Sequence, residues 1–236
     1  MLEKQTMKTI GLLGGMTCES SVEYYRFINE EFRKQVGGIH SAQSLMFSVD
    51  FGEIQPEMEM ERWDLVLERL VKGSLNVQRG GADFLVICTN TMHKMADQIA
   101  ERIEIPILNI IDVTAEAIKT MGLNTVGLLG TRFTMTQDFY RRRLKEKHGI
   151  ETLIPSDHEV STIHQVIMDE LTIGVISPTS KKLYWETIQR LQEQGAEGII
   201  LGCTEIPLLV KQDEGEIPLF DTTLLHAHAA VGLALE

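Results

Sequence analysis

The sequence is poor in cysteine and has no C-x-x-C pair. Its three cysteines are Cys18, Cys88 and Cys203, so the usual signature of a structural zinc site is missing. No apolar run approaches the roughly 18 residues of a membrane span. The start of the chain, MLEKQTMKTIGLLGG, lacks a long apolar core followed by a cleavage site, which argues against a secretory signal. We therefore expect reduced thiols in a cytoplasmic protein that is not attached to a membrane, with residues 1–6 as a short polar extension.

Positive charge is also scarce. The chain carries 22 lysines and arginines against 34 acidic residues, and its net charge is −12. Such a chain repels phosphate backbones, so no nucleic-acid partner is expected. The basic cluster at 141–147 is interpreted as a solvated helix face, with a binding patch as the alternative. Neither glycine-rich stretch, GLLGGMT or GLLGTRFT, has the Walker spacing or a G-x-G-x-x-G, which argues against a nucleotide site.

What the sequence does contain is an alternation of apolar strands and amphipathic helices. Its 236 residues, 43% of them hydrophobic, suit one large or two ordinary globular domains. Strands are predicted at 8–15, 44–51, 82–88 and 106–112, and helices at 20–35, 61–81, 93–103 and 113–123. The first helix is expected to have an apolar face formed by Val22, Tyr25, Phe27 or Ile28, and Phe32. This alternation predicts parallel β-α units and an α/β fold.

The second half of the sequence repeats the first. KTIGLLGGMT resembles NTVGLLGTRFT, GADFLVICTNT resembles GAEGIILGCTEI, and EIPILNIIDVTAEA resembles EIPLFDTTLLHAHA. The offsets are 116, 114 and 112 residues, and the three pairs keep their order. We infer an internal duplication that gives two pseudo-symmetric parallel-sheet domains. Because ligands bind beyond the carboxyl ends of parallel strands, the two domains are expected to share an active-site cleft.

The repeat also selects the residues that would face a ligand. At the offset of 114, Cys88 aligns with Gly202, and Thr89 aligns with Cys203. Successive side chains of a strand point to opposite sides, so Cys88 is interpreted as a small buried residue. Cys203 precedes a helix-like segment, whose N-terminus is expected to lower the pKa of the thiol. Asn90 and Thr91 stand where a strand meets a helix, and their N–H groups could hold a carboxylate.

We expect the histidines and the carboxylates at strand ends to have structural or orienting roles and no direct part in the reaction. His93 is interpreted as a structural residue at a helix start. His226 and His228 lie two positions apart and face different directions on a helix, which argues against a metal site built on them. Asp50 and Asp112 are expected to end strands and to orient neighbouring groups.

Three motifs together resemble the aspartate/glutamate racemase family: GLLGGM, the Asn-Thr-x-His at 90–93, and GCTEI around Cys203. The resemblance covers nearly the whole chain, including its duplication. It implies two α/β halves, here residues 1–115 with about 221–236, and residues 116–220. It also implies a homodimer that binds an amino acid or dicarboxylate, and catalysis without pyridoxal phosphate or metal. In this family two cysteines stand on opposite faces of the substrate α-carbon and exchange its proton.

The sequence departs from the family pattern at one of these cysteines. Where the family usually has Cys-Asn-Thr-x-His, this chain has Thr89 before Asn90. The resemblance therefore implies Cys203 and Thr89 as the catalytic pair, with a faster reaction from the L enantiomer, because a hydroxyl is a poor base. The substrate-binding residues it implies are Met16, Asn90, Thr91, Thr131 and Thr204. Thr17-Cys18 replaces the family's glycine-proline after GGM.

Two alternatives stay open at the level of sequence. A single working cysteine suits a decarboxylase or isomerase of the same superfamily, in which one proton donor is sufficient. A chain that kept the ligand site and lost a catalytic residue suits an amino-acid-binding protein with little or no catalysis. The intact Gly-Cys-Thr-Glu sequence around Cys203 favours an enzyme.

Overall fold

The computed structural model describes residues 7–236, so the polar extension expected at residues 1–6 lies outside the described residues. The described chain divides into two compact units. Unit 1 runs to Asn109 and takes in His226–Glu236, and unit 2 comprises Ile110–Leu225. Within residues 7–236, no helix has both the length and the apolar character needed to cross a membrane.

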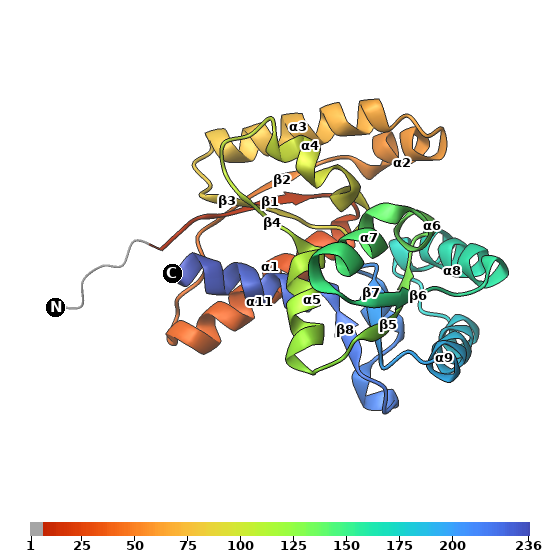
Figure 1. The fold of residues 1–236 in the computed structure, drawn as a ribbon. Coiled ribbons are helices and arrows are strands. Elements are labelled where there is room, and N and C mark those ends of the chain that lie inside the picture. Colours follow the sequence, from red (N-terminus) through yellow and green to blue (C-terminus); the bar gives the residue numbers. More distant parts are fainter. Residues whose placement is uncertain (1–6) are drawn as a thin grey trace. The chain divides into compact units, whose positions relative to one another are not determined.

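Unit 1 is a parallel sheet between two layers of helices (Figure 1). Its elements are β1 (Ile10–Gly14), α1 (Cys18–Val36), β2 (Ser44–Ser48), α2 (Phe51–Glu59), α3 (Trp63–Arg79), β3 (Phe84–Ile87), the 3-10 helix η1 (Thr91–Met95), α4 (Ala96–Ala100) and β4 (Ile107–Leu108). The strand order is β2-β1-β3-β4, and all pairs are parallel. α3 packs on β1 and β2, while α1 packs with the C-terminal helix α11 (Thr222–Leu235).

Unit 2 repeats this plan. Its elements are α5 (Ile110–Thr120), β5 (Thr125–Gly130), α6 (Arg132–Thr136), α7 (Asp138–His148), β6 (Glu151–Leu153), α8 (Asp157–Asp169), η2 (Leu171–Ile173), α9 (Pro178–Glu193), β7 (Gly198–Gly202), α10 (Ile206–Leu209), η3 (Gln212–Glu214) and β8 (Leu219–Asp221). The strand order β6-β5-β7-β8 corresponds strand for strand to that of unit 1. The predicted α/β class and the predicted duplication are confirmed.

The duplication holds to the level of single residues. In unit 1 Leu13 pairs with Ile87, and in unit 2 Leu129 pairs with Leu201. These pairs are related by the same offsets of 116 and 114 residues that the sequence repeats have. The register therefore agrees with the equivalence of Thr89 and Cys203 within the repeat.

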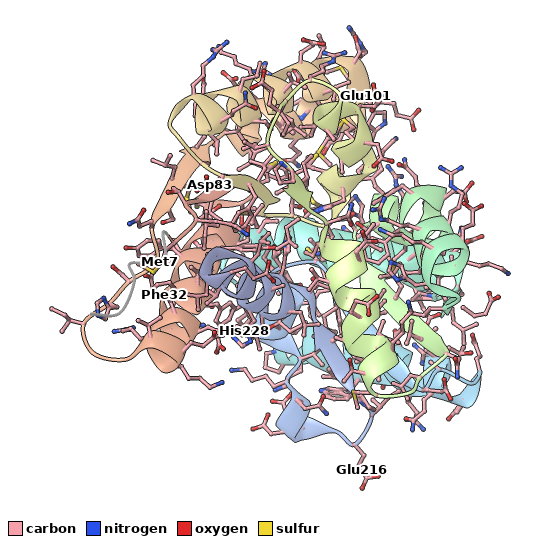
Figure 2. The ribbon with its side chains drawn as sticks, turned by 60° about the vertical axis from the view of Figure 1, so that its left-hand side comes forward. Met7, Phe32, Asp83, Glu101, Glu216 and His228 are labelled. Carbon is pink, nitrogen blue, oxygen red and sulfur yellow. The ribbon has the colours of Figure 1, made fainter. Side chains whose placement is uncertain are left out.

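The buried face of α1 differs in part from the prediction, because Ile28 and Phe32 are buried as expected but Val22 and Tyr25 are not. Tyr24, Ile28 and Phe32 are buried against the sheet and α11, whereas Val22 and Tyr25 are 62% and 55% exposed. The helical period allows either set to form a stripe, and contacts with distant parts of the chain choose between them. Figure 2 shows Phe32 on α1 and His228 on α11.

The predicted strand at 106–112 was also wrong in its length. β4 contains only Ile107–Leu108, and Asp112 lies in the first turn of α5. Its carboxylate accepts hydrogen bonds from Arg143 at 2.7 and 2.8 Å, from Lys147 at 2.6 Å and from His148 at 2.8 Å. The basic cluster on α7 is therefore only partly a solvated face, because two of its cations join α7 to α5.

Candidate active site

The candidate thiol of unit 2 lies where two neighbouring strands end together. Gly130, the last residue of β5, pairs with Gly202, the last residue of β7. A Cβ on Gly130 would lie 2.7 Å from the carbonyl oxygen of Gly202, and one on Gly202 would lie 2.9 Å from a backbone oxygen of β5. Glycine is therefore required at both positions, and Thr131 and Cys203 leave adjacent strands at the same level.

Cys203 is held by a buried carboxylate two residues further along the chain. Its thiol donates a hydrogen bond to Glu205 Oε2 at 2.9 Å, and the Thr204 hydroxyl donates to the same oxygen at 2.8 Å. Cys203 is 9% exposed and Glu205 is 3% exposed. This arrangement orients the thiol and places a proton acceptor in direct contact with it.

The electrostatics of Cys203 differ from the sequence-based expectation. Burial raises the pKa of the Cys203 thiol well above its usual value of 9.0, and the negative charge of Glu205 raises it further. The expected lowering by a helix N-terminus was wrong, because α10 is a single turn of four residues and the carboxylate is in contact with the sulfur. In this structure Cys203 is a neutral thiol that donates a hydrogen bond to Glu205.

A second buried group lies near this pair. Tyr184 of α9 is fully buried and donates a hydrogen bond to the Ile163 carbonyl at 3.3 Å. Burial raises the pKa of Tyr184 well above 10.0, and electrostatic interactions with Cys203, Glu170 and Glu205 add to this effect. A low-polarity, acidic environment therefore surrounds the thiol within unit 2.

In unit 1, the neighbouring cysteine is part of the hydrophobic core. Cys88 has no exposed surface and packs in the core cluster with Phe84 and Val86. Burial raises the pKa of its thiol far above 9.0. The interpretation of Cys88 as a small core residue is confirmed. Thr89, at 8% exposure, is the second residue after the end of β3.

The backbone at Thr89 is held by the buried His93, whose ring meets the ring of His226 edge-on. His93 Nδ1 lies 2.8 Å from the Thr89 carbonyl, so this nitrogen carries the proton and donates it. His226 Nε2 donates to the Leu108 carbonyl at 2.9 Å, which leaves Nδ1 to accept from the Tyr24 hydroxyl at 2.9 Å. Burial and the neighbouring His93 lower the pKa of His226 to about 3. His93 therefore has the structural role that the sequence suggested.

The remaining predicted site residues lie at strand ends within their own units. Asn90 and Thr91 are buried at the start of η1. Met16 is 5% exposed in the loop after β1, where Gly15 has a φ of +90° and a Cβ would clash with the Val49 carbonyl at 2.1 Å. Thr131 caps α6 by accepting a hydrogen bond from the Thr134 N–H at 3.3 Å.

The structure thus places Thr131, Cys203 and Thr204 at the carboxyl ends of neighbouring strands in the unit 2 sheet. Met16, Thr89, Asn90 and Thr91 follow strands β1 and β3 of unit 1. Asp50 is instead a helix cap, whose carboxylate accepts from the Gly52 N–H at 2.9 Å. Within residues 7–236, no group of three or more His, Cys, Asp or Glu side chains could hold a metal ion.

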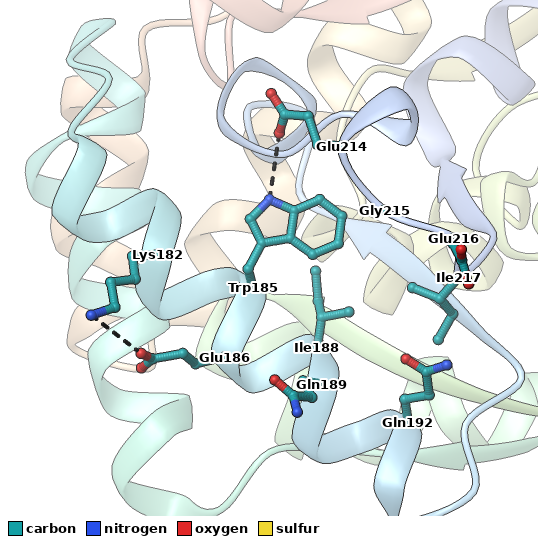
Figure 3. Close-up of a pocket in the computed structure, with 10 residues that line it drawn as sticks. All are labelled: Lys182, Trp185, Glu186, Ile188, Gln189, Gln192, Glu214, Gly215, Glu216 and Ile217. Carbon is teal, nitrogen blue, oxygen red and sulfur yellow. Dashed lines mark hydrogen bonds and ion pairs between the residues drawn. The ribbon is translucent and has the colours of Figure 1, made fainter.

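A groove in unit 2 lies apart from Cys203 (Figure 3). It has a volume of about 480 Å³ and lies between α9 and the segment at 214–217. Trp185 forms its wall, donating from Nε1 to Glu214 at 3.4 Å. The segment at 214–217 enters the amino end of β8, whereas Cys203 follows the carboxyl end of the parallel strand β7. The groove and the thiol therefore belong to opposite ends of the strands.

Sequence reasoning missed Glu205 and Tyr184. Glu205 stands inside the GCTEI motif, so its place two residues after the candidate thiol was a usable signal. Tyr184 lies in an ordinary amphipathic helix, and nothing local distinguishes it from a core tyrosine. Its proximity to Cys203 arises only from the packing of α9 in unit 2.

Comparison with solved structures gives the same fold over the whole chain. A Yersinia pestis protein described as a candidate Asp/Glu racemase is 46% identical, with a TM-score of 0.90, and the match covers 98% of this chain and 100% of that one. PH1733 of Pyrococcus horikoshii OT3, an aspartate racemase homologue, is 34% identical with a TM-score of 0.85 over 98% and 100% of the two chains.

Several curated proteins with similar sequences are named as amino-acid racemases. The broad specificity amino-acid racemase RacX of Bacillus subtilis is 26% identical over 172 residues, which are 73% of this chain and 74% of RacX. The glutamate racemase of Streptococcus gordonii is 35% identical over 133 residues, which are 53% of this chain and 46% of that protein. The model of the Asp/Glu/hydantoin racemase family matches residues 13–230. The chain therefore belongs to the Asp/Glu/hydantoin racemase family.

Proposed function

We propose that the protein is a cofactor-independent amino-acid racemase that acts on aspartate or glutamate. The observation that carries this proposal is the Cys203–Glu205 contact of 2.9 Å at the carboxyl end of β7. A thiol beside a buried carboxylate can become a thiolate without an external base. Family membership and the racemases among the similar proteins support the same reaction.

The proposed reaction begins with proton transfer from Cys203 to Glu205. The thiolate then takes the α-proton of the L enantiomer, which leaves a carbanion at the α-carbon and restores the thiol. Thr89 delivers a proton to the opposite face of the carbanion and regains one from solvent. Met16, Asn90, Thr91, Thr131 and Thr204 are the proposed contacts of the substrate carboxylate and ammonium groups. Glu205 then releases to solvent the proton that it took from Cys203. The net change is an inverted α-carbon, and the protein returns to its starting protonation state.

Thr89 in place of a second cysteine makes the two directions unequal. A hydroxyl can donate or relay a proton to a carbanion, but it is a much weaker acid than a thiol and a poor base at neutral pH. Reaction from the D enantiomer would require Thr89 to remove the α-proton. We therefore expect faster turnover from the L enantiomer. The equilibrium ratio of the enantiomers is still one, so a difference in their KM values must compensate for the difference in kcat.

The test is a set of initial rates with L- and D-aspartate and L- and D-glutamate, together with deuterium incorporation at the α-carbon in heavy water. Cys203→Ala should abolish exchange, whereas Cys88→Ala, a change in the core, should reduce it mildly at most. Thr89→Cys should make the two directions more alike. Full activity of Cys203→Ala would contradict the proposed base, and equal rates from both enantiomers in the wild type would contradict the asymmetry.

A second candidate reaction follows from the burial of Cys88. With Cys88 in the core, Cys203 is the buried thiol that has a proton acceptor in contact, which suits a decarboxylase that protonates one face. Release of carbon dioxide from an arylmalonate, without α-proton exchange of any amino acid, would favour this reaction. A measurable dissociation constant for an amino acid with neither activity would favour a binding protein.

A further inference from the structure

Arg132 is unusual among the residues that follow the strands. It is the first residue of α6 and stands two positions after the end of β5. In the part of the chain from 7 to 236, it is the only lysine or arginine within three residues after the end of any strand in either sheet. These are the positions from which parallel α/β sheets contact ligands.

Its place in the sheet puts Arg132 at the same end of the strands as the candidate thiol. Gly130 and Gly202 are paired across β5 and β7, and neighbouring strands lie about 4.8 Å apart. Thr131 and Cys203 are the next residues on the two strands, and Arg132 follows directly. The argument needs only unit 2, because both residues belong to the same sheet.

The guanidinium of Arg132 lies over an aromatic ring and, among the described residues, has no ion-pair partner. Its Cζ lies 5.2 Å from the centre of the Phe133 ring, and this buried ring meets the ring of His164 edge-on at 5.9 Å. Among the described residues, no carboxylate lies within ion-pair distance of Arg132. By contrast, Arg143 forms an ion pair with Asp112. Arg132 is therefore an exposed cation with its hydrogen-bond donors available, in a chain of net charge −12.

The charged side chains near Cys203 are carboxylates, which would repel an anionic substrate unless a cation compensates them. Glu205 contacts the thiol, and Glu170 adds a second carboxylate near Tyr184. A substrate with a carboxylate in its side chain brings further negative charge to this edge of the sheet. Guanidinium groups bind carboxylates through two parallel hydrogen bonds, which gives both charge compensation and orientation.

We propose that Arg132 binds the side-chain carboxylate of the substrate and so determines the preference for dicarboxylic amino acids. This inference rests on the proposed racemase function and adds the substrate class to it. Arg132 is a specificity-determining residue here and takes no part in the proton transfers. Its loss should weaken the use of acidic substrates and leave the chemistry at the α-carbon intact.

The experiment compares each acidic substrate with its amide, which has nearly the same shape and no charge. Deuterium incorporation at the α-carbon is measured for L-aspartate against L-asparagine and for L-glutamate against L-glutamine. Arg132→Leu should lower the acid-to-amide ratio of kcat/KM by about tenfold to a hundredfold, mainly through KM. Arg132→Lys keeps the charge and should retain much of the preference. Arg142→Leu removes a charge elsewhere on unit 2, on α7, and should change nothing.

The outcomes separate this inference from the racemase function. An unchanged ratio in Arg132→Leu, in a variant whose thermal melting matches the wild type, overturns the role of Arg132 alone. If the wild type exchanges amides as readily as acids, the role of Arg132 in specificity is also overturned, but the racemase proposal is not. A wild type that exchanges no amino acid overturns both. A loss of kcat for acids and amides alike would make Arg132 part of the general machinery and would also contradict this role.

Discussion

Replacement of Glu205 by glutamine should have two opposite effects on Cys203. The substitution keeps the shape of the side chain and its ability to accept hydrogen bonds from the thiol and from Thr204, but removes the charge. The thiolate should form more readily, because the carboxylate 2.9 Å from the sulfur no longer repels it. Catalysis should nevertheless fall, because an amide cannot accept the proton of the thiol.

The magnitudes follow from the distance. Two unit charges 4 Å apart at an effective dielectric constant of 20 interact by about 4 kcal/mol, and the two atoms here are closer. Even a third of that energy, about 1.4 kcal/mol, changes the thiolate population about tenfold. We therefore expect iodoacetamide to label Cys203 at least about tenfold faster near neutral pH. Loss of the internal proton acceptor should slow α-proton exchange by roughly a hundredfold to ten-thousandfold.

The assay is a time course of alkylation followed by peptide mass spectrometry, alongside α-deuterium exchange on the same preparations. Cys18 is exposed and serves as the internal control, since its labelling rate should not change. The reasoning would be refuted by unchanged or slower labelling of Cys203 together with unimpaired exchange. That result would mean that Glu205 neither restrains the thiolate nor accepts its proton.

Three further predictions concern stability. Gly130→Ala should lower the free energy of unfolding, measured in urea, by about 1–3 kcal/mol, because the new Cβ meets a backbone oxygen at 2.7 Å. Gly232→Ala lies in α11, where a Cβ has no neighbouring heavy atom within 4 Å, and should raise the free energy of unfolding by about 0.5–1 kcal/mol. Equal effects of the two substitutions would contradict the packing argument. His226 has a folded pKa of about 3 against an ordinary 6.5, so between these values the unfolded chain binds the extra proton and stability falls by about 1.4 kcal/mol per pH unit of acidification. His226→Gln should flatten this slope in urea melts, and an identical slope would show that another group is responsible. Burial raises the pKa of Asp112, but hydrogen bonds from Arg143, Lys147 and His148 outweigh this effect and lower the pKa. Asp112→Asn should therefore lower the free energy of unfolding by about 1–2 kcal/mol above pH 3.8 and by progressively less below it. Thermal melts across this range are the test, and a difference that stays constant with pH would contradict the ion-pair explanation.

The sequence predicted the fold well because the relevant signals are repeated. Three matched segments in the same order predicted two equivalent sheets, and the pairs Leu13–Ile87 and Leu129–Leu201 confirm their register. The choice of Thr89 over Cys88 as the counterpart of Cys203 needed only this register. Such inferences succeed because the alternation of strand side chains is a local property.

The errors arose where distant contacts decide the outcome. The buried face of α1 is fixed partly by Tyr24, whose hydroxyl bonds to a histidine 202 positions away. Asp112 belongs to a helix that Arg143 and Lys147 of α7 stabilise, 31 and 35 residues further along the chain. The pKa of Cys203 is governed by burial, which no local pattern reveals. The helix-dipole argument considered only the residues that follow the thiol.

The division of the chain also has a consequence for its synthesis. Unit 2 is one continuous segment, whereas unit 1 needs residues from both ends of the chain. Ala227, Ala230, Val231 and Ala234 of α11 are buried in the same core as Ile10 on the first strand. On the ribosome, the second half can therefore complete its core before the first half can. A chain cut before α11 would leave the earliest sheet to emerge with one side of its core uncovered.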